Sequence, residues 1–348
     1  MGNYTQKVLT KTLSPFIYYS GIHNLTKPFF GGRGHILMMH RVVFPTKKMR
    51  IHNHLSLEIT PEHLESIIKF FFKKGYDFIS LDLLTDWISN NRKTDRRFVA
   101  FTFDDGYKDN LEYAFPILKK HKVPFTIYIT NSFPENKAIL WWYLLEDLLI
   151  NVQSLQYHFP SGMVDVKCYN YSQKERAFNI IRNHLMQLNH ENIGDELNKF
   201  FSTYGLQVSN YTSELCLSWI DINTLIADPL FSIGSHTLNH HNLPNLSDKQ
   251  AFAEIYESKV IIEDKTKRTV KHFCYPLGKF GMREMDIVKK CNFLTATTTQ
   301  TGNLSLNHSI DFHSLPRIQV NSLTTEKVLK LQINGFYPAV LCLLPVNQ

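Results

Sequence analysis

The feature that most constrains this chain is an apolar run that stops on two adjacent carboxylates. Residues 98–103 have the apolar and β-branched character of a strand buried on both faces, and Asp104-Asp105-Gly106 follows at once. Two like charges at the edge of an apolar core are costly unless a cation or hydrogen-bond donors compensate them. The run therefore predicts a site at a strand end. A simple turn is the alternative, because Asp and Gly are common turn residues.

A second apolar run, residues 231–235, leads directly into His236-Thr237-Leu238-Asn239-His240. Histidines four residues apart would share one face of a helical turn, from which both imidazoles can reach one metal ion. The pair alone is weak evidence, because the chain has 16 histidines. Its position after a strand matches that of the Asp pair, and in a barrel of parallel strands both would open on the same face.

Strand and helix patterns alternate along the chain with short connections, which indicates a parallel sheet. We expect strands at 35–43, 78–81 and 124–129, and helices at 61–74, 83–88 and 111–118. Between about residues 140 and 218 the pattern changes to helices without strands of the barrel type, which predicts a helical insertion on the face where both motifs open. Trp141 and Trp142 begin it, and either core packing or stacking on a ligand ring would suit them.

Several of these stretches resemble known motifs. Thr102-Phe103-Asp104-Asp105-Gly106 and the segment 236–240 are similar to the first two motifs of the polysaccharide deacetylases, the NodB-homology fold of carbohydrate esterase family 4. Residues 36–42, 273–278 and 315–318 extend the resemblance over roughly residues 35–320. It implies an α/β fold, a distorted (β/α) barrel of the NodB type at 35–348 with a helical insertion at about 140–218, and a hydrolase that removes acetyl groups from a glycan.

The resemblance also implies a ligand set. Asp105, His236 and His240 would bind a divalent metal, with zinc expected and cobalt, nickel or iron also compatible. The metal would activate a water molecule and polarise an acetyl carbonyl. Asp104 would act as the general base, and the backbone N–H of Tyr107 would help to hold the oxyanion.

The chain departs from the family pattern in two places. Many members carry Arg and Tyr where Cys274 and Leu277 stand here, and we expect Arg317 to replace the Arg that orients the catalytic Asp; a surface arginine is the alternative. Many members also supply the general acid from a histidine in a terminal strand, and the run 339–344 has none. We expect His40 to be the acid, with His313 the second candidate, although either could be a buried structural histidine.

Composition and charge narrow the setting. Five scattered cysteines without a Cys-x-x-Cys pair argue against a disulfide framework or a zinc ribbon, and favour a reducing, cytoplasmic compartment. The net charge of +7 suits an anionic partner such as a lipid surface. No nucleic-acid motif accompanies it, so we expect no nucleic acid as a partner.

Residues 1–34 combine lysines with short aromatic pieces that proline and glycine interrupt. These pieces are too short to span a bilayer, and no cleavage site of a secretory signal follows them. The segment could lie on the inner face of an anionic membrane, or pack across the bottom of the barrel.

The sequence thus predicts a metal-dependent hydrolase that removes N-acetyl groups from an acetamido sugar of a cell-surface glycan or its lipid-linked precursor. An O-acetyl esterase or a deformylase on the same scaffold is one alternative. A non-catalytic glycan-binding protein that has lost its acid is the other.

Overall fold

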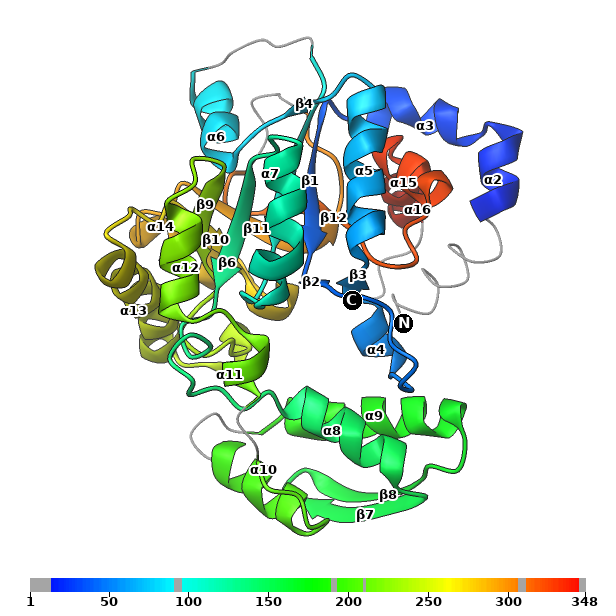
Figure 1. Ribbon diagram of the computed structural model, residues 1–348, viewed down its shortest axis with the longest axis vertical. Coiled ribbons are helices and arrows are strands. Elements are labelled where there is room, and N and C mark those ends of the chain that lie inside the picture. Colours follow the sequence, from blue (N-terminus) through cyan, green and yellow to red (C-terminus); the bar gives the residue numbers. More distant parts are fainter. Residues whose placement is uncertain (1–13, 91–95, 189–192, 209–210, 306–310, 344–348) are drawn as a thin grey trace.

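Seven parallel strands form a closed barrel in the computed structural model (Figure 1), which describes residues 14–90, 96–188, 193–208, 211–305 and 311–343. Around the ring the order is β1, β12, β11, β10, β9, β6 and β5, and β5 pairs with β1 to close it. The bounds are β1 Gly34–Met39, β5 Phe98–Phe103, β6 Phe125–Ile129, β9 Phe231–Ser235, β10 His272–Cys274, β11 Thr295–Thr301 and β12 Leu315–Gln319. The expected distorted (β/α) barrel is confirmed, with one strand fewer than the regular eight-stranded form.

Helices cover the outside of this ring (Figure 1). They are α5 Pro61–Lys73, α6 Leu81–Ser89, α7 Phe115–Lys120, α12 Trp219–Ile226, α13 Asp248–Thr266, α14 Met282–Lys290 and α15 Glu326–Ile333. Two short strands, β2 Arg41–Val42 and β3 Glu58–Ile59, pair in parallel beside α4 (His52–Leu55), and β4 (Asp77–Phe78) adds to β5. The main core lies between these helices and the apolar side chains of the ring, such as Leu37, Phe101 and Ile127.

The helix expected at 61–74 is confirmed as α5. The side chain of Thr60 accepts a hydrogen bond of 3.1 Å from the N–H of His63, which caps the first turn. The helix expected at 111–118 starts differently, with a π-helical turn, η2 Asn110–Ala114, before α7. Pro116 lies in the first turn of α7 and lacks the N–H that a regular α-helical turn would use, which accounts for the wider turn.

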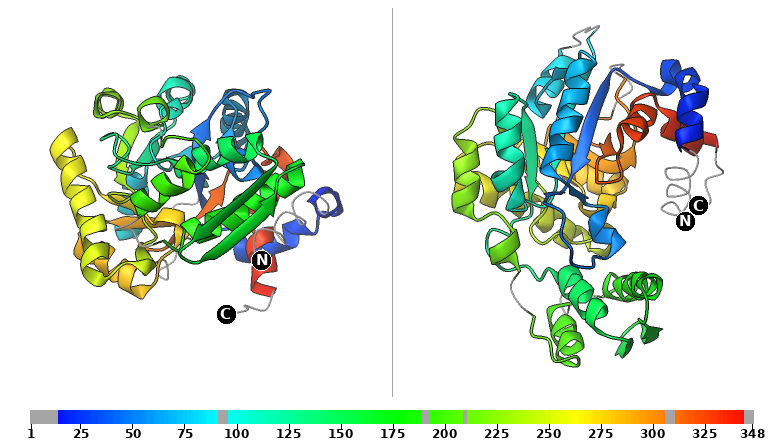
Figure 2. Two further views of the ribbon diagram at one scale, coloured as in Figure 1. Left: turned by 90° about the horizontal axis from the view of Figure 1, so that it is seen from below. Right: turned by 45° about the vertical axis from the view of Figure 1, so that its right-hand side comes forward.

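The insertion contains the helices α8 Trp141–Asn151, α9 Tyr171–Leu185, α10 Ile193–Ser202 and α11 Thr212–Leu215. It also contains an antiparallel hairpin, β7 Ser154–Phe159 and β8 Gly162–Lys167, which the sequence analysis missed. Leu155, Tyr157 and Phe159 alternate with polar residues along the sequence, which is the period-two signal that could have found it. The insertion has a core of its own, and both views place it at the carboxyl ends of the strands (Figures 1 and 2).

The N-terminal helices α2 (Ser14–Ser20) and α3 (His23–Phe30) pack on α15 and on α16 (Phe336–Leu343), at the side of the barrel (Figures 1 and 2). Gly335 permits this contact: it has a φ of 74°, and a Cβ there would lie 2.3 Å from the backbone of Phe30. Residues 14–30 of this segment therefore pack at the side of the barrel, whereas residues 1–13 lie outside the described residues. Among them, no helix is long and apolar enough to cross a membrane.

The cap of α5 gives a stability prediction. Thr60→Ala should lower the free energy of unfolding by about 1 kcal/mol, because the N–H of His63 loses its acceptor. Urea unfolding followed by circular dichroism measures it. Thr224→Ala is the control, since Thr224 lies exposed inside α12 and bonds only the carbonyl of Ile220; its effect should stay within about 0.5 kcal/mol. Equal losses in the two variants would contradict the capping role.

Candidate active site and metal centre

The two sequence motifs meet at one end of the barrel. Asp104 follows β5 and His236 follows β9, and β6 pairs in parallel with both strands. The carboxylates and the imidazoles therefore emerge on the same side of the ring, at its carboxyl end. Asp104, Asp105 and His236 are all buried there. The expectation that the two motifs open on one face is confirmed.

Asp105, His236 and His240 converge on one point. Oδ1 of Asp105 lies 3.4 Å from Nε2 of His236 and 3.4 Å from Nε2 of His240. The three potential ligand atoms all lie within 4.8 Å of one another. One carboxylate and two imidazoles leave further coordination positions open for water and substrate, which is the arrangement of a catalytic zinc-type site.

The chemistry of this donor set fits a cation. Oδ1 of Asp105 is buried and has no hydrogen-bond partner among the described residues, a costly state that a metal ion would relieve. Nδ1 of His236 lies 2.7 Å from the carbonyl oxygen of Cys274. A carbonyl only accepts, so Nδ1 carries a proton, and Nε2 is the nitrogen that faces Asp105 and would bind a cation. Burial lowers the pKa of His240 to about 4 and keeps that imidazole neutral. At His236 burial also favours the neutral form, but Cys274 and Asp105 outweigh it and raise the pKa well above its ordinary value, so a cation bound at Nε2 would replace a proton there.

The histidine pair does not lie on a helical turn, and this expectation was wrong. Thr237 and His240 have φ values of 70° and 59°, so the backbone turns irregularly after β9. The loop is held by α13, where the carboxylate of Glu254 accepts hydrogen bonds from the N–H and the side-chain amide of Asn239. Asp105 also has a positive φ, 77°, a sparsely populated conformation that recurs at functional sites. Local bends fixed by tertiary contacts therefore bring the ligands together.

Asp104 has a separate partner. Arg317, on β12, is buried and donates two hydrogen bonds of 2.7 Å, one to each carboxylate oxygen of Asp104. It also donates to Oγ1 of Thr102 at 3.1 Å and to the carbonyl of Thr298 at 2.8 Å. Burial alone would raise the pKa of the Asp104 carboxyl, but the charge and hydrogen bonds of Arg317 outweigh it and hold that pKa below its ordinary value. A surface position for Arg317 is excluded.

A second set of possible ligands comprises Asp104, His236 and Cys274. Here Nη2 of Arg317 lies 2.7 Å from Asp104 and 3.1 Å from Sγ of Cys274. A cation between these atoms would face the guanidinium directly, and like charges at this distance repel strongly in a buried site. The set that contains Asp105 is therefore the better metal site. Cys274 stands where many family members carry an arginine, and here its Sγ contacts the guanidinium of Arg317.

His40 stands on the open side of Asp104. It follows β1, and its Nε2 lies 3.9 Å from Oδ2 of Asp104, with 15% of the side chain exposed. This position allows it to meet a substrate at the site. His313 lies before β12, and its Nε2 is 2.9 Å from the carbonyl of Phe293, which precedes β11. It is therefore at the opposite end of the barrel, and is not brought to the site.

Sequence reasoning missed a buried network behind His40. Asp109 accepts hydrogen bonds from Nε of Arg41 at 2.7 Å and from the N–H of Val42 at 2.9 Å. The side chain of Asn110 donates to the carbonyl of His40 at 2.8 Å. The loop after β5 thus fixes the segment after β1. The only signal in the sequence is that polar residues directly follow both strands.

The insertion contributes an aromatic wall. Trp142 is half-buried, and its ring centroid lies 6.4 Å from that of His240 and 6.5 Å from that of Phe133. Trp141 is buried in the core of the insertion. Trp141 therefore packs in a core, which was one of the two alternatives for this pair, whereas Trp142 borders the site.

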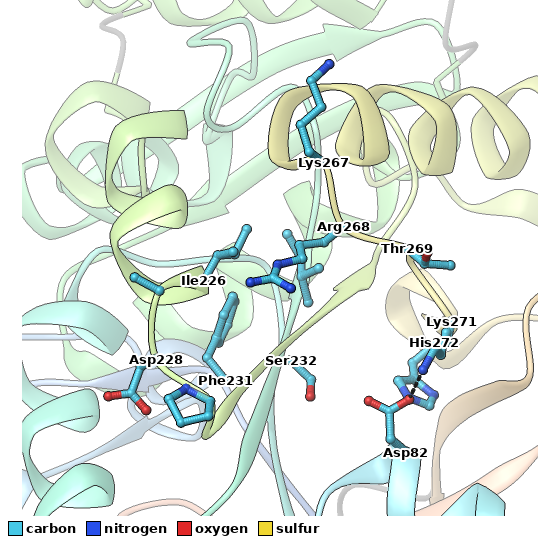
Figure 3. Close-up of a pocket in the computed structure, with 13 residues that line it drawn as sticks. Asp82, Ile226, Asp228, Phe231, Ser232, Lys267, Arg268, Thr269, Lys271 and His272 are labelled. Carbon is cyan, nitrogen blue, oxygen red and sulfur yellow. Dashed lines mark hydrogen bonds and ion pairs between the residues drawn. The ribbon is translucent and has the colours of Figure 1, made fainter.

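A polar cavity of about 590 Å³ lies elsewhere in the barrel (Figure 3). Its lining includes Asp228 and Ser232, at the amino end of β9, together with Arg268 and Lys271. The ligand set follows the carboxyl end of β9, so this cavity is separate from the site. A dashed line in Figure 3 marks the ion pair between Asp82 and Lys271, in which Nζ of Lys271 lies 2.8 Å from Oδ1 of Asp82.

A family model described as polysaccharide deacetylase matches residues 91–296, which is more than half of the chain. The chain belongs to the polysaccharide deacetylase family. It is accordingly a hydrolase that acts on the amide bonds of acetylated polysaccharide. A putative polysaccharide deacetylase of Bacillus subtilis, YxkH, is 20% identical over 266 residues, which cover 76% of this chain and 67% of that protein.

Solved deacetylase structures share the fold. The Streptococcus pyogenes deacetylase PplD, in complex with acetate, has a TM-score of 0.57 at 17% identity and covers 86% of this chain and 97% of its own. A de-N-acetylase from Aggregatibacter actinomycetemcomitans has a TM-score of 0.55 at 14% identity, with 86% and 99% covered. IcaB from Ammonifex degensii has a TM-score of 0.54 at 14% identity, with 88% and 98% covered.

Substitutions should distinguish the roles of the two adjacent carboxylates, Asp104 and Asp105, in this deacetylase. Asp105→Asn and His236→Ala should each lose bound metal and activity together, because a neutral amide is a poor ligand for a hard or borderline cation. Asp104→Asn should keep its metal while the rate falls by roughly 10²–10⁴-fold, the range for loss of a general base. Metal content and acetate release are measured on the same samples.

Cys274→Ser is the matched control for the competing ligand set, and it should retain the metal. Loss of metal from Asp104→Asn and Cys274→Ser, with retention in Asp105→Asn, would place the ion in the other set and reverse the assigned roles. Circular dichroism shows whether each variant is folded.

Arg317 should act through the ionisation of Asp104. Because Arg317 lowers the pKa of that carboxyl, Arg317→Met should raise it, so the base becomes protonated at a higher pH. The acid limb of the pH–rate profile should then move upward by about 1–3 units. Arg317→Lys keeps a charge without the paired geometry and should move it less. A lower rate with an unmoved limb in folded variants would reduce Arg317 to a structural role.

Proposed function

We propose that this chain is a metal-dependent deacetylase that hydrolyses the N-acetyl group of an acetamido sugar in a cell-surface glycan or its lipid-linked precursor. One observation carries the proposal. A buried carboxylate oxygen of Asp105 without a hydrogen-bond partner among the described residues faces two imidazole nitrogens, beside a second carboxylate that is independently paired with Arg317. Such a site combines a cation position with a charged base.

The proposed metal is zinc, which Asp105, His236 and His240 would hold; cobalt, nickel or iron are alternatives that the same ligands accept. When bound, the metal supplies Lewis-acid polarisation and lowers the pKa of a water molecule.

The base and its support come from the protein itself. Asp104 takes a proton from the attacking water at one of its carboxylate oxygens. Each oxygen has two lone pairs, so the hydrogen bonds from Arg317 leave acceptor capacity free. Arg317 keeps the carboxylate ionised and fixes its plane, since a guanidinium binds both oxygens at once. The proton is therefore removed by a group whose position and charge are set before substrate binds.

We propose that the backbone N–H of Tyr107 helps to hold the oxyanion. The residues on either side of Tyr107 bond to the end of the insertion. The carbonyl of Gly106 accepts a hydrogen bond of 2.9 Å from the N–H of Leu217, and the N–H of Lys108 donates one of 2.8 Å to the carbonyl of Leu215. The N–H of Tyr107 between them has no acceptor among the described residues. A donor left free in a buried loop suits the negative charge that develops on an acetyl oxygen.

His40 is the proposed general acid. Its Nε2 lies close to Asp104 on the half-open side of the site, and no hydrogen bond to that nitrogen occurs within the described part of the chain. An amine leaving group must be protonated as it departs, whereas an alkoxide from an O-acetyl ester needs this help less. A histidine in this place therefore favours the amide substrate. Trp142 offers an aromatic surface for a sugar ring beside it.

For location, we propose the cytoplasm, at the inner face of the membrane. The five cysteines support a reducing compartment, since all five are free thiols and four of them are buried. A lipid-linked precursor would present the acetamido sugar on this side.

Acetate release tests the function. The zinc-loaded full-length protein is incubated with oligosaccharides of N-acetylglucosamine, with an O-acetylated glycan that lacks amides, and with an N-formyl sugar. We expect acetate and free amine in equal amounts from the first. His40→Ala should slow this reaction by roughly 10²–10⁴-fold. Acetate from the O-acetylated glycan alone would identify an esterase, formate release a deformylase, and binding without any release a glycan-binding protein; each contradicts the proposal.

A further inference from the structure

The two N-terminal helices expose several large apolar side chains. Phe16 and Tyr19 on α2, and Leu25 and Phe29 on α3, are between 71% and 80% exposed, and Ile22 between the helices is 49% exposed. The outer side of a surface helix ordinarily carries polar residues. Large apolar side chains gathered on one exposed surface mark an interaction site. These five residues are called the apolar face below.

The inner sides of the same helices are fixed to the barrel. Oγ1 of Thr26 donates to the carbonyl of Asn334 at 2.9 Å, and Nδ1 of the buried His23 lies 2.8 Å from the side-chain amide of Asn334. At the edge of the apolar face, the hydroxyl of Tyr19 accepts a hydrogen bond of 2.8 Å from Nζ of Lys327 on α15. Because these polar contacts hold the inner sides against α15 and the turn after it, the helices cannot bury the apolar face by rotating.

Cations without counter-charges border this face. Lys27 lies on α3 itself, Lys330 on α15 stacks over the ring of Tyr18 at 4.9 Å, and Lys74 follows α5. Among the described residues, no carboxylate oxygen lies within 4.0 Å of these three amines, although such pairs are common elsewhere in the chain. Burial and the charges of Arg97, Lys330 and Lys74 lower the pKa of Lys27. Such a cluster of like charges is stabilised by an anionic partner.

We propose that the apolar face and its three lysines dock on an anionic lipid bilayer. Phenylalanine, tyrosine and leucine side chains enter the region between headgroups and acyl chains, and the lysines meet lipid phosphates. A second copy of this chain is a poorer occupant, since a two-fold contact would bring each lysine cluster against its own copy. The proposal is independent of the deacetylation chemistry.

The placement leaves the site accessible. Figures 1 and 2 show α2 and α3 at the side of the barrel, next to α15 and α16, and well separated from the insertion at the carboxyl ends of the strands. A membrane that contacts the apolar face would therefore not cover the insertion. The enzyme could stay bound at the lipid surface while a glycan enters beside Trp142.

Vesicle flotation with the full-length protein tests the docking. One set of vesicles contains phosphatidylcholine alone, and a second set contains phosphatidylcholine with phosphatidylglycerol. We expect at least tenfold more binding to the anionic set, and a marked decrease at high salt. Phe29→Glu should abolish most of this binding. Lys27→Gln and Lys330→Gln should each weaken it about fivefold, the effect of one cation near an anionic surface.

Ile220→Glu is the matched control. Ile220 is 79% exposed on α12, on another side of the barrel, against 80% for Phe29. The Ile220→Glu variant should bind vesicles like the unchanged protein. Both Phe29→Glu and Ile220→Glu should retain acetate release from a soluble oligosaccharide. Equal vesicle binding by the two Glu variants, or no preference for anionic lipid, would overturn the proposal. So would a dimer in size-exclusion chromatography that Phe29→Glu dissociates, because the occupant would then be a second copy. If the unchanged protein binds anionic vesicles but releases no acetate, the proposed function is contradicted and the docking proposal is not.

Discussion

Two adjacent carboxylates are buried at the end of β5, and the surrounding structure is arranged to compensate each of them differently. Asp104 is neutralised by the guanidinium of Arg317, whereas Asp105 faces two imidazoles and keeps an oxygen without a hydrogen bond. Removal of one partner of a buried ion pair costs about 3–5 kcal/mol, so the position of Arg317 is strongly constrained. The proposed division of labour, with Asp104 as base and Asp105 as metal ligand, rests on this difference in partners.

Closure of the barrel is what makes this compensation possible. Arg317 lies more than two hundred residues after Asp104, and reaches it because β12 pairs with β1 and β1 pairs with β5. The same closure places His40, which follows β1, beside Asp104. The proposed base, its orienting arginine and the proposed acid thus come from three neighbouring strands of a rigid ring. Sites built on such elements hold their groups with little freedom, which suits catalysis by prearranged charges.

The two additions to the barrel serve different surfaces. The insertion borders the catalytic face, where Tyr143 on α8 accepts a hydrogen bond of 3.2 Å from Arg41, the residue after His40. Arg41 also pairs with Asp109, so the insertion, the first strand and the loop after β5 are connected by one buried network. The N-terminal helices instead extend the barrel sideways through contacts with α15 and α16, and expose apolar side chains beside lysines. One addition shapes access to the site, and the other offers a surface unrelated to the chemistry.

The sequence by itself determined the parts that local chemistry encodes. Apolar runs ending in charge identified the strands that carry the site, the residues at Thr60 and Pro61 identified the start of α5, and the motifs identified the family. The tertiary structure decided what depends on distant partners. That His236 and His240 converge through an irregular loop, that His313 lies at the wrong end of the barrel, and that Asp109 and Asn110 fix the segment of His40 could not be derived from spacing. Spacing fixes positions along an element, but the direction of a side chain beyond a strand end depends on backbone bends that only the packed neighbours select.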